Sequence, residues 1–248
     1  MFIFIILLIL GIAHGTNSSN ADNAAATPAP AQASPQKEEE VARVIAKSDE
    51  ALRMEAYGLV NVKSYAPDIV VQLAYASSNN ILQTQLYYNF NEAYLQKNAA
   101  IKLALAQNII KSINPGFSIV VHDAVRPQRV QQRCWELARA RRMQHLFMPP
   151  GNISMHTYGV AVDVSLISLD TNTEVDMGGN PDDPSALAAP KRERDMLQSG
   201  RLSQQQYANR LLLRKAMQAA GFSPIGNEWW HFEACSRREA REKYRPII

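Results

Sequence analysis

The stretch Ser154–Ser168 (SMHTYGVAVDVSLIS) has a strand pattern and contains His156 and Asp163, two side chains that could bind a metal ion. From Gly159 onward, branched apolar residues alternate with small or polar ones, which is typical of a strand with distinct faces. Val162 faces one way and Asp163 the other. A carboxylate among apolar residues is costly to bury unless a cation meets it. The stretch therefore predicts a strand whose polar face meets an arginine, as in an ordinary salt bridge, or a metal ion.

The remaining domain mixes helix and strand patterns without regular β–α–β alternation, which predicts an α+β fold. Ser203 and Gln206 form a capping-box pattern at the start of the last long helix, and Gly221 ends it. The predicted helices cover residues 38–56, 90–113, 127–147 and 203–220. The predicted strands cover residues 68–75, 117–123, 159–168 and 228–233.

The first 37 residues differ in composition from the remainder of the chain. Residues 2–13 are an apolar run followed by small residues, which predicts a signal peptide over residues 1–15. The run is shorter than the roughly 20 residues that a membrane span needs, so we expect no stable membrane insertion after cleavage. Residues 16–37 are rich in Ala, Pro, Ser and Asn and predict a disordered linker. The folded domain is then expected over residues 38–248, and the signal peptide predicts export to the periplasm.

Charge and histidine content narrow the possible functions. The 248 residues include 26 Lys and Arg against 23 Asp and Glu, and a net charge of +3 is too small to favour nucleic-acid binding. Four of the five histidines lie after the signal peptide. We expect His122 at a core or strand-edge position and His145 on the surface. His156 and His231 are the two candidates for chemistry.

Two cysteines, Cys134 and Cys235, lie in the exported domain. An oxidising compartment permits a disulfide between them, provided that their Cα atoms lie within about 7 Å. Two separate thiols are the alternative, and the sequence leaves both open.

A hydrolytic zinc site needs three protein ligands and an open position for water. His156, Asp163 and His231 supply two imidazoles and one carboxylate. A further group must take a proton from the water and pass it to the leaving amine, and Glu228 is near His231 in the chain. Since residues three apart in a strand face opposite ways, Glu228 must sit in a turn where the strand begins.

Two blocks, Ser154–Asp163 (SxHxxGxAxD) and Glu228–His231 (ExWH), resemble the metal-binding blocks of the D-alanyl-D-alanine dipeptidases. These are zinc D,D-dipeptidases of the peptidase M15 family, related to D,D-carboxypeptidases and to the hedgehog fold. The resemblance implies a single hedgehog/DD-peptidase-like domain with a central antiparallel sheet flanked by helices. Three other segments resemble family blocks: Leu73–Ala76, Asp123–Pro127 and Met177–Asp182.

The resemblance also implies roles for individual residues. One zinc ion per chain is expected on His156, Asp163 and His231, with Glu228 as general base. Arg126 is expected to stabilise the tetrahedral intermediate.

The implied substrate is the small zwitterion D-Ala-D-Ala, a dipeptide of cell-wall metabolism. Tyr75 and Ser154 are expected to orient it, and Asp182 to bind its ammonium group. Asp183 follows directly, and the resemblance leaves the choice between these two aspartates open. The sequence does not indicate an oligomeric state.

Three other functions compete. A D,D-carboxypeptidase or endopeptidase acting on peptidoglycan stem peptides would use the same residues with a different cleft. A non-haem Fe(II) oxygenase also uses two histidines and a carboxylate, but usually with closer spacing than that of His156 and Asp163. A binding module with a structural zinc site would need neither Glu228 nor Arg126.

Overall fold

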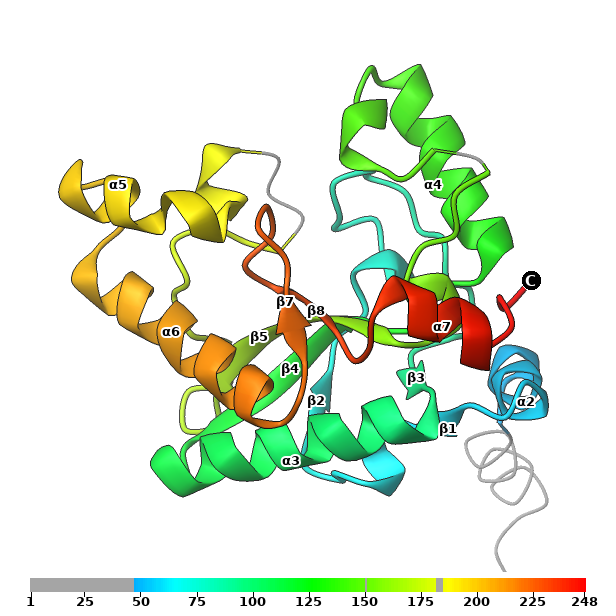
Figure 1. The fold of residues 1–248 in the computed structure, drawn as a ribbon, viewed down its shortest axis with the longest axis horizontal. Coiled ribbons are helices and arrows are strands. Elements are labelled where there is room, and N and C mark those ends of the chain that lie inside the picture. The colour runs from blue at the N-terminus through cyan, green and yellow to red at the C-terminus, as the bar shows by residue number, and fades with distance from the viewer. Residues whose placement is uncertain (1–46, 150, 182–184) are drawn as a thin grey trace, which may run out of the picture. The chain divides into compact units, whose positions relative to one another are not determined.

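Two neighbouring strands, β4 (Phe117–Asp123) and β5 (Ala161–Ser168), form the middle of the sheet in the computed structural model (Figure 1). The structure describes residues 47–149, 151–181 and 185–248. The predicted signal peptide and linker lie outside these residues, as do Asp182 and the first part of the predicted helix 38–56.

The sheet runs in the order β2-β4-β5-β8-β7, and β6 pairs with β5. Every pair is antiparallel except β2 with β4, which is parallel. A separate two-stranded antiparallel sheet joins β1 to β3. The shorter strands are β1 (Val60–Asn61), β2 (Val70–Val71), β3 (Tyr94–Leu95), β6 (Thr173–Glu174), β7 (Ser223–Pro224) and β8 (His231–Glu233).

Helices flank the sheet, with α3 packed against β4 and alongside α6. In Figure 1, α3 runs below the sheet and α4 stands above it. The predicted α+β class is thus confirmed. The helices are α2 (Asp49–Ala56), α3 (Lys97–Ile113), α4 (Gln128–Ala140), α5 (Glu193–Gln198), α6 (Gln204–Ala219) and α7 (Arg237–Lys243).

The core lies between the sheet and these helices. Val162, Val164 and Leu166 of β5 are fully buried, as are Leu103 and Ile110 of α3. Burying each such side chain contributes about 1.5–3 kcal/mol. The alternation predicted for β5 is present, but both faces of the strand are buried instead of one meeting solvent.

Two predictions fail where short strands replace longer elements. The predicted strand 68–75 is reduced to Val70–Val71, and Tyr75 lies instead in a 3₁₀ turn over Ala74–Ala76. The predicted helix 90–113 begins only at Lys97, because residues 94 and 95 pair with β1. In both places apolar residues are buried by tertiary contacts, which the helical or alternating pattern alone does not reveal.

Four boundaries also differ. The helix predicted from Pro127 to residue 147 ends at Ala140, and Pro127 is its N-cap. The predicted strand 228–233 begins at His231, and strand 159–168 begins at Ala161. Residues 47 and 48 precede α2, which Ser48 caps. The Ser203–Gln206 capping box of α6 is confirmed.

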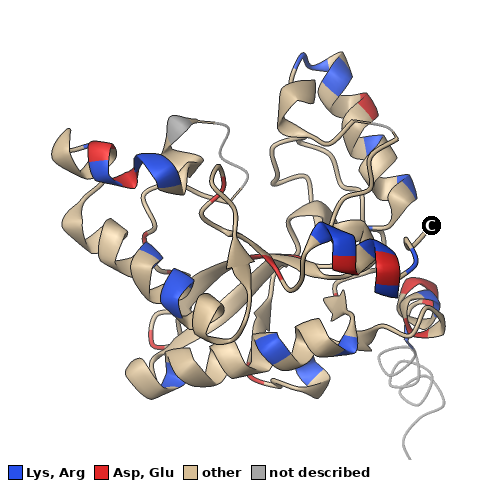
Figure 2. Ribbon diagram, viewed as in Figure 1, with Lys and Arg blue, Asp and Glu red and all other residues tan. Residues whose placement is uncertain are grey.

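Charged residues are spread over several elements. Lys and Arg lie on α3, α4, α6 and α7, and on α4 and α7 they are interspersed with Glu (Figure 2). Among the described residues, no helix is both long and apolar enough to cross a membrane. Cys134 and Cys235 do not form a disulfide, so the alternative of two separate thiols describes this structure.

Candidate active site and metal centre

Asp163 and His231 lie opposite each other on neighbouring antiparallel strands. In the ladder between β5 and β8, Ala161 pairs with Glu233 and Asp163 pairs with His231. Directly opposite side chains leave the sheet on the same face, with Cβ atoms about 4.5–5.5 Å apart. Strand register therefore brings together two residues that are 68 positions apart in the sequence.

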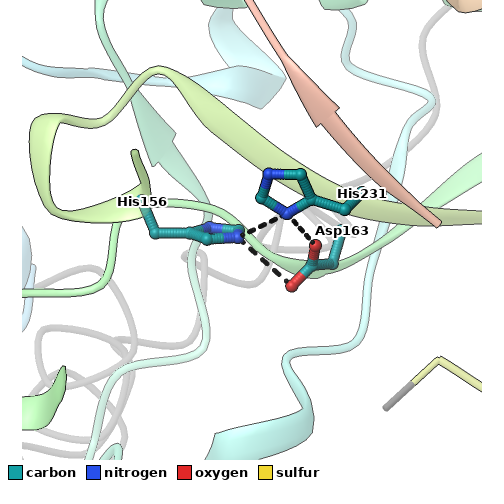
Figure 3. A group of neighbouring side chains, drawn as sticks. All are labelled: His156, Asp163 and His231. Atoms are coloured by element: carbon teal, nitrogen blue, oxygen red, sulfur yellow. Dashed lines mark hydrogen bonds and ion pairs between the residues drawn. The ribbon is translucent and has the colours of Figure 1, made fainter. Parts of the chain in front are cut away.

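His156 reaches the same point from a tight turn. The 3₁₀ turn His156–Tyr158 ends at Gly159, whose φ is 69°. A Cβ at position 159 would lie 2.9 Å from Leu59 Cδ2, so both backbone conformation and space require glycine there. The chain then enters β5, and His156 faces Asp163 and His231 (Figure 3).

These three residues, the His–Asp cluster, have the spacing of metal ligands. His156 Nε2 lies 3.2 Å from His231 Nδ1 and 3.3 Å from Asp163 Oδ2. His231 Nδ1 lies 2.9 Å from Asp163 Oδ1. Nitrogen and oxygen ligands held tetrahedrally at about 2.0–2.1 Å from a zinc ion are roughly 3.3 Å from one another. The donor set and its spacing fit a metal ion, and all three residues are buried.

The hydrogen bonding of His156 favours the same conclusion. Its Nδ1 lies 2.7 Å from the carbonyl oxygen of Ala124. A carbonyl only accepts, so Nδ1 donates this hydrogen bond and Nε2 is the ring nitrogen left to bind a metal ion. Nε2 is the atom that faces the other two residues of the cluster. A backbone acceptor of this kind typically fixes the tautomer and orientation of a metal-binding histidine.

Hydrogen bonds and charges within the cluster shift the pKa values of Asp163 and His231. Although burial alone would raise it, the nearby histidines hold the pKa of Asp163 well below its usual range. Burial lowers the pKa of His231, but the hydrogen bonds to Asp163 and Glu233 and the charges of Asp163 and Glu228 together outweigh burial and raise the pKa to about 10. His231 is therefore protonated at neutral pH, and metal binding would release this proton.

Glu228 lies beside this cluster. Residues 226 and 227 and residues 229 and 230 form bends before β8, as the predicted turn requires. Glu228 Oε2 is 3.9 Å from His231 Nδ1. Burial raises the pKa of the Glu228 carboxyl against the lowering effect of the His231 charge. The side chain is therefore a stronger base than an exposed glutamate and lies next to the His–Asp cluster.

Arg126 lies between β4 and α4 with its guanidinium turned toward the cluster. Its Nε and Nη2 donate to Asp123 Oδ2 over 2.7 and 2.6 Å, and Nη1 donates to Gln131 over 3.0 Å. Nη2 is also 3.6 Å from Asp163 Oδ2. The guanidinium carbon lies 5.1 Å from the centre of the Tyr75 ring. The group is thus held on several sides with one edge near the cluster.

The supporting residues of Arg126 were not recognised as site residues in the sequence. The Tyr87 hydroxyl donates to Asp123 Oδ1 over 2.9 Å, and the Ala124 amide donates to the same oxygen over 3.0 Å. Asp123 belongs to the segment Asp123–Pro127, whose resemblance to a family block points to Arg126. That resemblance is the one sequence signal for a role of Asp123 in the site. Gln131 reaches Arg126 only because both α4 and the loop before it are folded, so no local sequence pattern indicates this hydrogen bond.

The His–Asp cluster, Glu228 and Arg126 line a cavity of about 720 Å³. Tyr75 and Ser154 line it, and the Ser154 hydroxyl accepts a hydrogen bond from the His156 amide. Two segments border the cavity: residues 145–148, which follow α4, and residues 185–192, which precede α5. We call residues 185–192 the pocket wall. Asp182, the predicted ammonium ligand, lies outside the described residues. The structure thus brings together seven of the eight predicted site residues: Tyr75, Arg126, Ser154, His156, Asp163, Glu228 and His231.

The two remaining histidines lie away from the cluster. His145 is exposed, as expected, and lies at the rim of the cavity. His122 is at the end of β4, where its Nε2 is 3.2 Å from Glu174 Oε2. It lines a second groove, together with Asn79 and Asn91, and does not line the cavity that holds the cluster.

Comparison with known proteins places this geometry in a family context. Residues 54–245 match the Peptidase_M15 family model, described as D-ala-D-ala dipeptidase. The chain is 32% identical over 175 residues to a D-alanyl-D-alanine dipeptidase of Escherichia coli (strain K12), covering 71% of this chain and 83% of that protein. It is 28% identical over 176 residues to a protein of the same name from Synechocystis, covering 58% and 71%. A third protein of this name, from Enterococcus faecalis, is 34% identical over 80 residues, covering 32% and 36%.

Proposed function

The chain belongs to the peptidase M15 family of D-alanyl-D-alanine dipeptidases, and from this premise we propose that it is a zinc-dependent enzyme that cleaves D-Ala-D-Ala into two D-alanines. The observation that carries the proposal is the His–Asp cluster, with three donor atoms at ligand spacing beside a half-buried glutamate. Family membership supports a peptidase that acts on this dipeptide. The zinc ion and the catalytic residues are the additional content of the proposal.

His156, Asp163 and His231 would hold the zinc ion. When bound, the ion acidifies a water molecule and polarises the scissile carbonyl. Glu228 takes a proton from the attacking water and delivers it to the leaving amine, a double role for which its raised pKa is suited. His156 is kept in its ligand tautomer by the Ala124 carbonyl. The remaining protein groups bind and orient the substrate.

Arg126 donates hydrogen bonds to the oxygen on which negative charge develops. Because Asp123 and Gln131 fix the guanidinium before substrate binds, little reorganisation is needed during the reaction. Tyr75 lies against its face, is almost fully buried and borders the cavity. These contacts support a preorganised charge-assisted donor.

The two ends of the dipeptide explain a preference for short substrates. A free dipeptide carries an ammonium group and a carboxylate, each of which must be matched by charge or hydrogen bonding. Tyr75 and Ser154 line the cavity and would orient the substrate. Asp182 would bind the ammonium group. A longer peptide has an amide where the dipeptide has its ammonium group. It would lack the positive charge that pairs with Asp182 and would therefore be a poorer substrate.

A second candidate function has one observation in its favour. Lys191 and Arg192 of the pocket wall and Arg237 of α7 also line the cavity. No ion pair joins these three cations to a carboxylate among the described residues. Cations at a cavity rim favour acidic peptides, so a D,D-carboxypeptidase or endopeptidase acting on peptidoglycan stems is the alternative.

Metal analysis combined with a hydrolysis assay tests the proposal. We expect about one zinc per chain, release of D-alanine from D-Ala-D-Ala, loss of turnover with a chelator and recovery with zinc. Cleavage of a pentapeptide stem but not of the dipeptide would favour the second candidate. Bound zinc with no cleavage of any D,D-peptide would contradict both and indicate a structural site. Oxygen consumption with Fe(II) would instead indicate an oxygenase.

We also propose export to the periplasm, on the basis of the apolar run at residues 2–13. Expression of the full chain followed by cell fractionation tests this. A mature protein that begins near residue 16 in the periplasmic fraction is expected, whereas an uncleaved chain in the cytoplasm would contradict the proposal.

A further inference from the structure

We propose that Arg210 of α6 is a positioning residue for the active site, one whose buried guanidinium holds the pocket wall and the segment carrying Glu228 in place relative to each other. The proposal rests on the proposed function, since it concerns the same cavity. Arg210 touches neither the His–Asp cluster nor the cavity lining in any described contact. Its effect on the reaction is therefore indirect.

The guanidinium of Arg210 is bound to the backbone of the wall. The side chain is 0% exposed, and a buried cation is costly unless its N–H groups find acceptors. Nε donates to the Met177 carbonyl over 2.6 Å, and Nη1 donates to the Leu187 carbonyl over 2.8 Å. Leu187 belongs to the pocket wall. Five residues of this wall line the cavity: Ser185, Ala188, Ala189, Lys191 and Arg192.

Glu193 secures the far end of the same wall. It directly follows Arg192, is buried, and accepts from Arg210 Nη1 over 3.4 Å. Both of its carboxylate oxygens also accept from Arg214 Nη2 over 2.7 Å. The carboxylate compensates the buried charge of Arg210, so the guanidinium can remain ionised inside the protein.

The other side of Arg210 contacts the segment that carries the proposed base. Its guanidinium carbon lies 5.1 Å from the centre of the Trp229 ring, a cation–π contact within the protein interior. Trp229 directly follows Glu228 and packs edge-on against Trp230, which lines the cavity. A shift of the Trp229 ring would therefore move the backbone of Glu228.

Only arginine suits this place. A guanidinium offers several fixed donors in a plane and a face that stacks on an aromatic ring, whereas a lysine offers a single charged nitrogen. Arg210→Lys keeps the charge but cannot bind both carbonyls and Glu193 while stacking on Trp229. Arg214→Lys is a matched control, because Arg214 lies on the same helix and also pairs with Glu193.

Steady-state kinetics on the zinc-loaded full chain provide the first test. We expect Arg210→Lys to lower kcat/KM for D-Ala-D-Ala by about 10- to 100-fold, as misplacement of a catalytic group does. Both kcat and KM should change, because the base and the wall are both displaced, and zinc content should stay at the wild-type level. Arg214→Lys should change kcat/KM less than about 3-fold, the loss expected of an ion pair that keeps its charge. Equal losses in both variants, or none in Arg210→Lys, would overturn the proposal.

Hydrogen exchange on the metal-free proteins gives a second readout that does not depend on activity. Amides of residues 185–192 and 228–231 should exchange faster in Arg210→Lys than in Arg214→Lys, with α3 unchanged. This outcome would stand even if the wild-type chain failed to cleave the dipeptide, so the two proposals can fail separately. If Arg210→Lys does not fold, Trp229→Leu and Trp229→Phe replace it. The leucine variant should lose kcat and the phenylalanine variant should retain most of it, and equal kcat in both would overturn the proposal.

Discussion

The His–Asp cluster and the pocket wall border the same cavity but are built in different ways. Asp163 and His231 sit on paired strands in the centre of a sheet, and His156 lies one turn before the strand that carries Asp163. The wall, residues 185–192, consists of 3₁₀ turns and irregular backbone. We propose that its position depends on Arg210 of α6, which binds the Leu187 carbonyl and the glutamate that follows the wall.

This difference separates bond chemistry from substrate selection. Ladder hydrogen bonds hold the cluster at ligand spacing, and a change there should alter metal binding. The wall has no ladder, so a change there should alter substrate binding while metal binding persists. Irregular segments on a rigid scaffold commonly carry specificity in this way.

Asp163→Asn is expected to have the largest effect, because it changes the His–Asp cluster and leaves the pocket wall intact. Removing the carboxylate deletes one proposed zinc ligand and the charge that balances two histidines and Arg126. We expect zinc content to fall well below one per chain and turnover to fall to background, measured by metal analysis and D-alanine release. Asp170→Asn, at an exposed position after β5, is the control and should behave as wild type. Full zinc content in Asp163→Asn would show that the carboxylate is not a ligand.

Glu228→Gln should separate metal binding from proton transfer. The amide cannot accept the proton of the attacking water, so kcat should fall by about 10²- to 10⁴-fold while zinc is retained. Glu136→Gln, on the exposed side of α4, should leave kcat unchanged. Loss of zinc together with kcat would instead assign Glu228 a ligand role.

Arg126→Lys tests whether the fixed guanidinium stabilises developing charge. A lysine cannot keep the bonds to Asp123 and Gln131 while also facing the cluster, so kcat should fall by about 10²- to 10³-fold. Arg133→Lys, at an exposed site on α4, serves as the control. A change in KM alone would indicate that Arg126 binds the ground state.

Gly178→Ala probes the segment that leads into the wall. Gly178 has a φ of +74°, and a Cβ there would lie 2.5 Å from Leu202 Cδ1. We expect a loss of about 1–3 kcal/mol in the free energy of unfolding, with a higher KM and unchanged zinc content. Gly200→Ala is a matched control, since its φ is +70° but a Cβ would meet nothing within 4 Å. Equal losses in both variants would show that backbone strain alone is responsible.

Much of the site could be predicted from the sequence because its signals are local. His156 and Asp163 lie within one turn and strand, and Glu228 and His231 within four residues, so each half appears as a short motif. The alternation of β5 and the capping box of α6 are likewise local patterns. Element boundaries are less visible in the sequence. The helical pattern extends over Tyr94 and Leu95, because it does not reveal the pairing with β1 that makes these residues a strand.

The sequence by itself therefore determined the α+β class, the candidate ligands and the candidate base. Only the tertiary structure decided how Asp123 and Gln131 hold Arg126, and how Arg210 connects Met177, Leu187 and Trp229. The physical reason is that hydrogen bonds and stacking between distant segments follow no period along the chain. In the sequence, Arg210 is one charged residue of a helix, and its role comes from being buried among carbonyls, a carboxylate and an indole.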